Sequence, residues 1–177
     1  IPIIIKGRIP KTQKRCVHNG NCPANQLASQ SLNEMDSERG IWYAAQYGDL
    51  ERVRKLANER RCADEKDSAG YTALHYAARN GHLTVCLFLL DNGADVNAVT
   101  KGGATALCRA ATAGKEDVVD LLLSKKADPF IQDSDGKTAL HRATENKHFE
   151  ICKRLLNVAP SLCEVADNRG NKAAVRN

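Results

Sequence analysis

Residues 70–82 read Gly-Tyr-Thr-Ala-Leu-His-Tyr-Ala-Ala-Arg-Asn-Gly-His, and this stretch decides the fold because parts of it recur along the chain. The segment Thr-Ala-Leu-His at 72–75 returns as Thr-Ala-Leu-Cys at 105–108 and as Thr-Ala-Leu-His at 138–141, 33 residues later each time. The pair Leu89-Leu90 recurs with the same spacing. Self-similarity at a fixed period of about 20–50 residues indicates a tandem array of similar structural units.

Each unit has the pattern of two short helices joined by a tight turn. Thr72 suits the position before a helix, because its hydroxyl can accept a hydrogen bond from a free amide of the first turn. Gly81 suits the left-handed residue that ends this helix. The second helix, at about 82–90, places Val85, Cys86 and Leu89 on one face. The sequence therefore predicts an all-α fold, a solenoid of helix-turn-helix units.

Helix pairs this short cannot bury a core alone, so their stability must come from stacking on neighbouring pairs. The period places units at about 37–69, 70–102, 103–135 and 136–169, with a partial cap at 170–177. We therefore predict one repeat domain over residues 31–177. Residues 1–30 are predicted to form a basic, disordered N-terminal extension.

The net charge of +5 lies in the N-terminal part of the chain. Residues 1–33 hold five Lys or Arg and no acidic residue, so the remainder is balanced. A neutral array lacks the basic face that nucleic-acid binding requires, and we do not expect a nucleic-acid partner for the repeats. No apolar run approaches the roughly 20 residues of a membrane span, so we expect no membrane partner either.

The cysteines indicate the compartment. There are seven, an odd number scattered along the chain. Free cysteines within helical segments suit a reducing environment, which predicts a cytoplasmic or nuclear protein. Cys86, Cys108 and Cys152 fall on predicted helices, where we expect them to be small buried apolar side chains.

These segments resemble the ankyrin repeat, a unit of 33 residues with Thr-Pro-Leu-His near its start. The matching stretches are residues 70–82 and Gly-Ala-Asp-Val-Asn-Ala at 93–98. Ala replaces Pro at positions 73, 106 and 139, and Cys108 replaces His. The resemblance implies a non-catalytic adaptor, a monomer that binds a partner protein through its loop tips and inner helices. It implies no catalytic residue, no cofactor and no metal.

The resemblance also implies which residues contact the partner. The positions that it indicates are Tyr47, Ser68, Tyr71, Arg79, Asn80, Lys101, Thr112, Asp135, Lys137 and Glu145. Tyr and Arg are the residue types that most often dominate binding energy, which favours Tyr47, Tyr71 and Arg79. The central part of this surface, residues 101–113, is small and polar. We expect it to allow close approach of a partner backbone or to form a weak interface.

Other candidate sites have structural explanations. His75 and His141 occupy the repeat's own histidine position, where the ring is expected to brace the loop to the threonine. Trp42 has the same phase in the first unit and is expected to close the N-terminal end of the core. Asn97 lies in a pattern that resembles ankyrin asparagines hydroxylated by an oxygen-sensing dioxygenase, and it is a candidate for that modification.

The alternative function lies in the extension. Cys16, His18 and Cys22 offer thiolate and imidazole ligands at short spacing, but a structural zinc site requires four ligands. The fourth would have to come from the fold, for example from Cys62. The alternative is therefore a metal- or nucleic-acid-binding protein that acts through residues 1–30.

Overall fold

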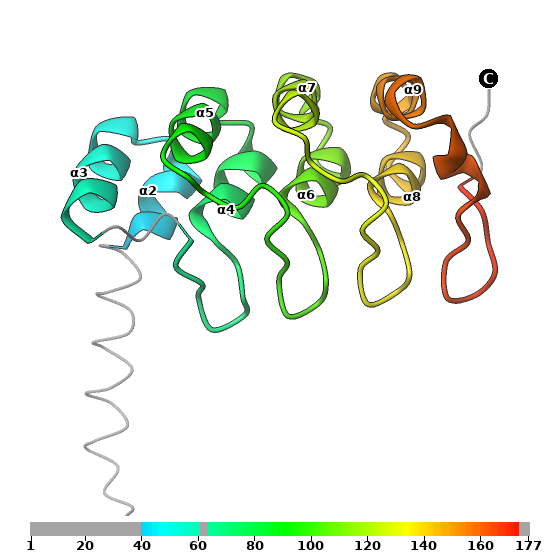
Figure 1. Ribbon diagram of the computed structural model, residues 1–177, viewed down its shortest axis with the longest axis horizontal. Helices are drawn as coiled ribbons and strands as arrows, with labels where there is room; N and C mark the ends of the chain where they lie inside the picture. The colour runs from blue at the N-terminus through cyan, green and yellow to red at the C-terminus, as the bar shows by residue number, and fades with distance from the viewer. Residues whose placement is uncertain (1–39, 61–63, 174–177) are drawn as a thin grey trace, which may run out of the picture. The chain divides into compact units, whose positions relative to one another are not determined.

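The computed structural model describes residues 40–60 and 64–173, and in this part of the chain it is all helical, as the sequence predicts. The inner helices are α2 (Ile41–Tyr47), α4 (Ala73–Asn80), α6 (Ala106–Thr112) and α8 (Ala139–Glu145). The outer helices are α3 (Leu50–Arg60), α5 (Leu83–Asp91), α7 (Glu116–Ser124) and α9 (Phe149–Val158). A 3-10 helix, η1 (Pro160–Glu164), follows α9. Figure 1 shows the two sets as separate layers, with the long loops on the side of the inner helices.

The core forms between consecutive helix pairs. Each inner helix packs on the next, α2 on α4, α4 on α6 and α6 on α8, and the outer helices follow the same order. Alanines make the close approach of inner helices possible, and Ala77, Ala78, Ala110 and Ala111 are completely buried. Leucines of the outer helices, such as Leu122, complete the layer between them. The all-α repeat solenoid predicted from the 33-residue period is thereby confirmed.

The repeat histidine joins the inner helices α4 and α8 to the loop that follows in the next unit. The Thr72 amide donates to His75 Nδ1 at 3.1 Å, so the ring proton lies on Nε2, which donates to the Ala104 carbonyl at 3.0 Å. His141 forms the same pair of contacts, with Thr138 and with the Asn171 carbonyl. Burial lowers the pKa of His75, which keeps the imidazole neutral in this arrangement.

Trp42 forms a comparable brace in the first repeat. Its side chain is half buried against the core, and its indole N–H donates to the Glu65 carbonyl at 2.9 Å. That it closes the N-terminal end of the core stays a prediction. The indole also links α2 to the following loop, as the imidazoles do in later repeats.

The loops stack on one another through their backbones. The Lys101 amide donates to the Ala69 carbonyl at 3.0 Å, and the Ser134 amide donates to the Gly102 carbonyl at 2.9 Å. The next pair, Asn168 and Asp135, repeats the contact at 3.0 Å. These bonds fix the spacing of the loop tips, so the surface that the loops form is as regular as the helical layers.

Several sequence predictions concern residues that the structure does not describe. Residues 1–39 and 174–177, which include the predicted extension and the end of the predicted cap, lie outside the described residues. Cys62 lies outside them as well. Within the described ranges, no helix has the length and apolarity needed to cross a membrane.

The loop stacking requires glycine at position 70. Gly70 has φ +84°, and an added Cβ would lie 2.7 Å from the Lys101 amide nitrogen. Gly93 has a similar φ of +87° with nothing within 4 Å of an added Cβ. We expect Gly70→Ala to lower the free energy of unfolding by about 2–4 kcal/mol, and Gly93→Ala by about 1 kcal/mol, because only the first adds a clash to the backbone strain. Urea denaturation of both variants measures the difference, and equal losses would contradict the loop-stacking account.

Candidate functional site

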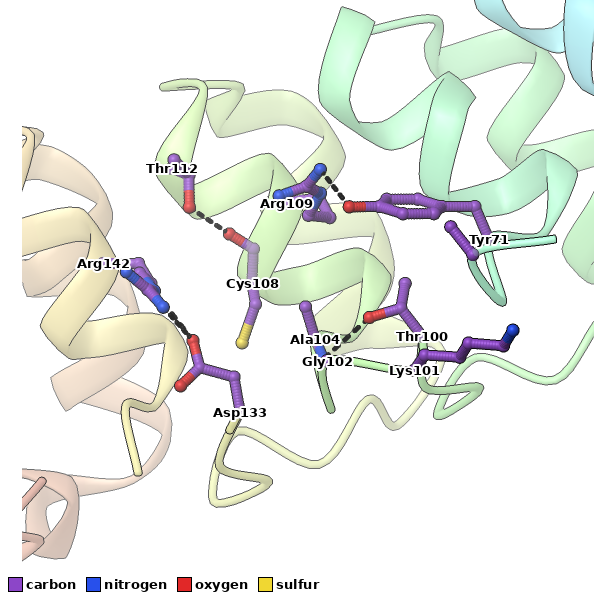
Figure 2. Close-up of a pocket in the computed structure, with 11 residues that line it drawn as sticks. Tyr71, Thr100, Lys101, Gly102, Ala104, Cys108, Arg109, Thr112, Asp133 and Arg142 are labelled. Carbon is purple, nitrogen blue, oxygen red and sulfur yellow. Dashed lines mark hydrogen bonds and ion pairs between the residues drawn. The ribbon is translucent and has the colours of Figure 1, made fainter. Parts of the chain in front are cut away.

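A hollow of about 460 Å³ opens on the loop side of the third repeat. We call it the loop-face hollow. Its walls come from α6, from the start of α8 and from the three loops that precede α4, α6 and α8 (Figure 2). The residues that line it are Ala69, Tyr71, Thr100, Lys101, Gly102, Ala104, Cys108, Arg109, Thr112, Asp133 and Arg142.

The hollow coincides with the third repeat, where neither the histidine brace of the second and fourth repeats nor the tryptophan brace of the first is present. Cys108 takes the histidine position, and its side chain is too short to reach the next loop as His75 and His141 do. The helix cap survives, because Thr105 Oγ1 accepts from the Cys108 amide at 3.2 Å. Cys108 is only 2% exposed, and burial raises the pKa of its thiol. The thiol therefore stays protonated and is a poor nucleophile.

An aspartate in the loop before α4, and another in the loop before α8, connects that loop to the inner helix that follows it; we count each of these loops with the repeat that it leads into, the second and the fourth. Asp67 Oδ1 accepts from the Tyr71 amide at 2.8 Å, and its Oδ2 accepts from the Tyr76 hydroxyl at 2.7 Å. Burial raises the pKa of Asp67, but these hydrogen bonds outweigh it and the net shift is downward. Burial and the bond to Asp67 raise the pKa of Tyr76 to about 12. The pair is thus an ionised carboxylate and a neutral phenol.

The fourth repeat repeats this arrangement with an arginine. Asp133 Oδ1 accepts from the Lys137 amide at 3.0 Å, and its Oδ2 accepts from Arg142 Nε at 2.8 Å. The Asp133 side chain is only 4% exposed, and Arg142 provides the opposite charge beside its buried carboxylate. Asp135 also accepts from Arg142, at 2.8 Å. The positive charge of Arg142 is therefore balanced by carboxylates of the same chain.

The third repeat departs from this arrangement. Thr100 stands where the others have aspartate, and its hydroxyl oxygen accepts from the Ala104 amide at 3.1 Å. It has no second oxygen and no charge for Arg109, the residue in phase with Tyr76 and Arg142. Arg109 instead donates from Nη2 to the Tyr71 hydroxyl at 2.5 Å, with its guanidinium carbon 4.8 Å from the centre of that ring.

Arg109 is left with unused hydrogen-bonding capacity. Among the described residues it forms no ion pair, and its Nε is buried without a hydrogen-bond partner. An unsatisfied buried donor costs about 1–3 kcal/mol. A guanidinium that has no ionic partner can donate strong, charge-assisted hydrogen bonds to an anion.

The structure places the predicted partner contacts in three groups. Tyr71, Lys101 and Thr112 line the loop-face hollow. Tyr47, 62% exposed, and the exposed Ser68, Arg79 and Asn80 lie outside it, on the first two repeats. Asp135, Lys137 and Glu145 surround Arg142 on the fourth repeat, where Lys137 pairs with Glu145. Whether a partner contacts any of them stays a prediction.

The sequence interpretation missed the residues that give the hollow its charge. Arg109, Arg142 and Asp133 line it and were not among the predicted contacts. The signal for them was present in the 33-residue alignment, where Thr100 interrupts the series Asp67 and Asp133. Cys108, interpreted only as a buried side chain, is buried and also borders the hollow.

The remaining predicted sites have clear structural surroundings. Asn97 Oδ1 accepts from the Asp128 amide at 2.8 Å and so links two consecutive loops, and its hydroxylation stays a prediction. Cys86 and Cys152 are fully buried, and burial raises the pKa of Cys86 to about 12. In residues 40–60 and 64–173, no group of three or more His, Cys, Asp or Glu side chains could hold a metal ion. The candidate ligands Cys16, His18 and Cys22 lie outside those ranges.

The comparison with protein families identifies the class of the chain. A family model described as ankyrin repeats (3 copies) matches residues 14–100 and 95–169. The chain therefore belongs to the ankyrin-repeat family. Repeats of this family generally mediate protein–protein interaction, and proteins built from them are typically non-enzymatic.

Individual relatives share only part of their length with this chain. Ankyrin repeat domain-containing protein 39 of Homo sapiens is 59% identical over 71 residues, 40% of this chain and 39% of that protein. Its Bos taurus counterpart is 55% identical over 67 residues, 38% of this chain and 35% of that protein. A protein named palmitoyltransferase akr1 from Aspergillus oryzae is 40% identical over 83 residues, but these cover only 11% of its length. The matched part thus spans about two-fifths of the first two relatives.

Because position 108 lacks the histidine brace, we expect Cys108→His to stabilise the protein. The new imidazole would accept from the Thr105 amide and donate to the Lys137 carbonyl, as His75 does with Thr72 and Ala104. We expect the free energy of unfolding to rise by about 1 kcal/mol, the net value of one buried hydrogen bond. Thermal and urea unfolding measure the change. Cys108→Ala, which keeps the hollow but adds no brace, is the control, and a His variant no more stable than this Ala variant would contradict the assignment.

Proposed function

We propose that this protein is an adaptor that binds a partner protein through its loop tips and inner helices. The observation that carries the proposal is the loop-face hollow, where an aromatic ring, a guanidinium and an exposed lysine side chain lie on a face whose side chains are not needed for packing helix on helix. The binding unit is the repeat domain, predicted as residues 31–177. The partner's identity is a separate question, because one frame of repeats serves many partners.

The chemistry of the hollow supports a protein partner. Tyr71 and Arg109 are half buried and in contact with each other, and Tyr and Arg are enriched among residues that dominate protein interfaces. Gly102 and Ala104 at the rim have little or no side chain. A partner backbone can therefore approach the loop closely, which matches the small, polar centre expected from the sequence.

The surroundings of the hollow can enlarge the interface. Arg79 and Tyr47 are exposed on the preceding inner helices, and a stable interface usually buries about 800 Å² on each partner. The free, buried thiols of Cys86, Cys108 and Cys152 suit a reducing compartment, which supports the cytosol or nucleus. The monomeric state stays a prediction from the resemblance.

Co-purification with paired charge variants tests this function. The full chain is used as bait, and retained proteins are identified by mass spectrometry. The first variant, Arg79→Ala/Lys101→Ala, removes two positive charges from the loop and inner-helix face. The matched control, Lys125→Ala/Lys153→Ala, removes two from the outer helices, where both lysines form exposed ion pairs that contribute little to stability.

We expect a specific partner to be retained by the wild type and the control and to be lost or reduced about tenfold with the first variant. Retention of the same partner by both variants would place binding elsewhere on the protein. Circular dichroism of both variants checks that the helices are intact.

A further inference from the structure

The loop-face hollow lacks one group that its neighbours possess. In the second and fourth repeats, a loop carboxylate bonds the loop amide with one oxygen and the inner-helix side chain with the other, Asp67 to Tyr76 and Asp133 to Arg142. Thr100 performs only the first of these tasks, with its hydroxyl on the Ala104 amide. The place of the second carboxylate oxygen, facing Arg109, is therefore unfilled by the protein itself.

The charges around the hollow favour an anion. Lys101, Arg109 and Arg142 are the cations that line it, and Asp133 is the anion. Asp133 is already committed to Arg142, so it cannot serve Arg109. Lys101 is exposed at the rim and, within the described residues, forms no ion pair. The uncompensated positive charge thus belongs to Arg109 and Lys101.

The geometry of Arg109 selects a planar anion. A guanidinium presents its N–H donors as a fork that matches the two oxygens of a carboxylate. The contact with the Tyr71 hydroxyl uses one Nη2 donor, and Nε is buried without a partner among the described residues, so a ligand in the hollow would be bound by the terminal Nη donors. Figure 2 shows Arg109 and Tyr71 on one wall and Arg142 with Asp133 on the opposite wall, with Cys108 between them. The short Cys108 side chain leaves the space that an imidazole would occupy.

We infer that the loop-face hollow binds the carboxylate of an Asp or Glu side chain from an extended segment of the partner protein. The partner's carboxylate would be the ionic hydrogen-bond acceptor for Arg109, as the Asp133 carboxylate is for Arg142. Lys101, at the rim of the hollow, would attract the same carboxylate by its positive charge. The inference rests on the proposed function, because it names the chemistry by which the partner is recognised. The small rim residues Gly102 and Ala104 allow the segment's backbone to pass close to the loop.

A titration followed by nuclear magnetic resonance tests the inference without a partner. The probe is glutamate capped at both ends, N-acetyl-glutamate amide, added to the full chain, with the capped glutamine as the uncharged control. The reporter is the Arg109 Nε–H signal. We expect a saturable shift with the glutamate probe in the millimolar range and at least about tenfold weaker binding of the glutamine probe.

Two substitutions at position 100 isolate the charge. Thr100→Asp supplies the missing carboxylate from within, and Thr100→Asn supplies the same shape without charge. We expect the glutamate probe to bind Thr100→Asp at least about tenfold more weakly than Thr100→Asn, with Thr100→Asp no less stable to heat. If either variant does not fold, Arg109→Gln is used instead, with the Lys101 amide signal as the reporter. We then expect Arg109→Gln to bind the glutamate probe about tenfold more weakly than the wild type.

Three results would overturn the inference. The first is no saturable shift in the wild type, and the second is equal binding by the Asp and Asn variants. The third is tighter binding of N-acetylglycine or inorganic phosphate than of capped glutamate, which would assign the hollow to a chain terminus or to a phosphate group. If the titration shows no binding but the co-purified partner is still lost with Arg79→Ala/Lys101→Ala, this inference is overturned and the adaptor function is not. A successful titration with no partner lost would overturn the adaptor function instead.

Discussion

The stacking of short inner helices against one another is the constraint on which the other features depend. Helices such as α4 and α6 contain 8 and 7 residues, well below the roughly 12–15 at which an isolated helix becomes even marginally stable in water. They persist because buried alanines such as Ala77 and Ala110 let each helix rest on the next. This packing requires the inner helices to recur at the same spacing along the chain. The loops and the bracing side chains between them therefore recur at that spacing as well.

A strict register gives meaning to each departure from it. In the third repeat Thr105 provides the helix cap and Thr100 the loop bond, as Thr72 and Asp67 do in the second repeat. Where the third repeat omits a contact, at Cys108 and at the second oxygen of position 100, stability does not require that contact. The two omissions border the same hollow, and Arg109 between them is left without a carboxylate. The proposed carboxylate site therefore lies where the repeated structural pattern is interrupted.

The sequence predicted the fold well because its pattern is repeated. The recurrence of Thr-Ala-Leu-His and of buried leucines located the inner and outer helices of the second to fourth repeats, and the second helix of the second repeat begins at Leu83, close to the expected position. The candidate site was harder to predict. Lys101 and Tyr71 were predicted as partner contacts from the family resemblance, whereas the role of Arg109 depends on which residue faces it across the hollow. That relation between a loop and a helix is set by packing and is only implicit in the alignment of Thr100 with Asp67 and Asp133.

The central claim is that Arg109 faces the place of a carboxylate that the third repeat does not supply. A double-mutant cycle of Thr100→Asp and Arg109→Gln, measured by urea denaturation, tests this directly. We expect a favourable coupling of about 1 kcal/mol or more between Asp at position 100 and Arg109, as for contacting groups in one ion pair. A coupling near zero would mean that Arg109 does not reach the loop position, and would contradict the account.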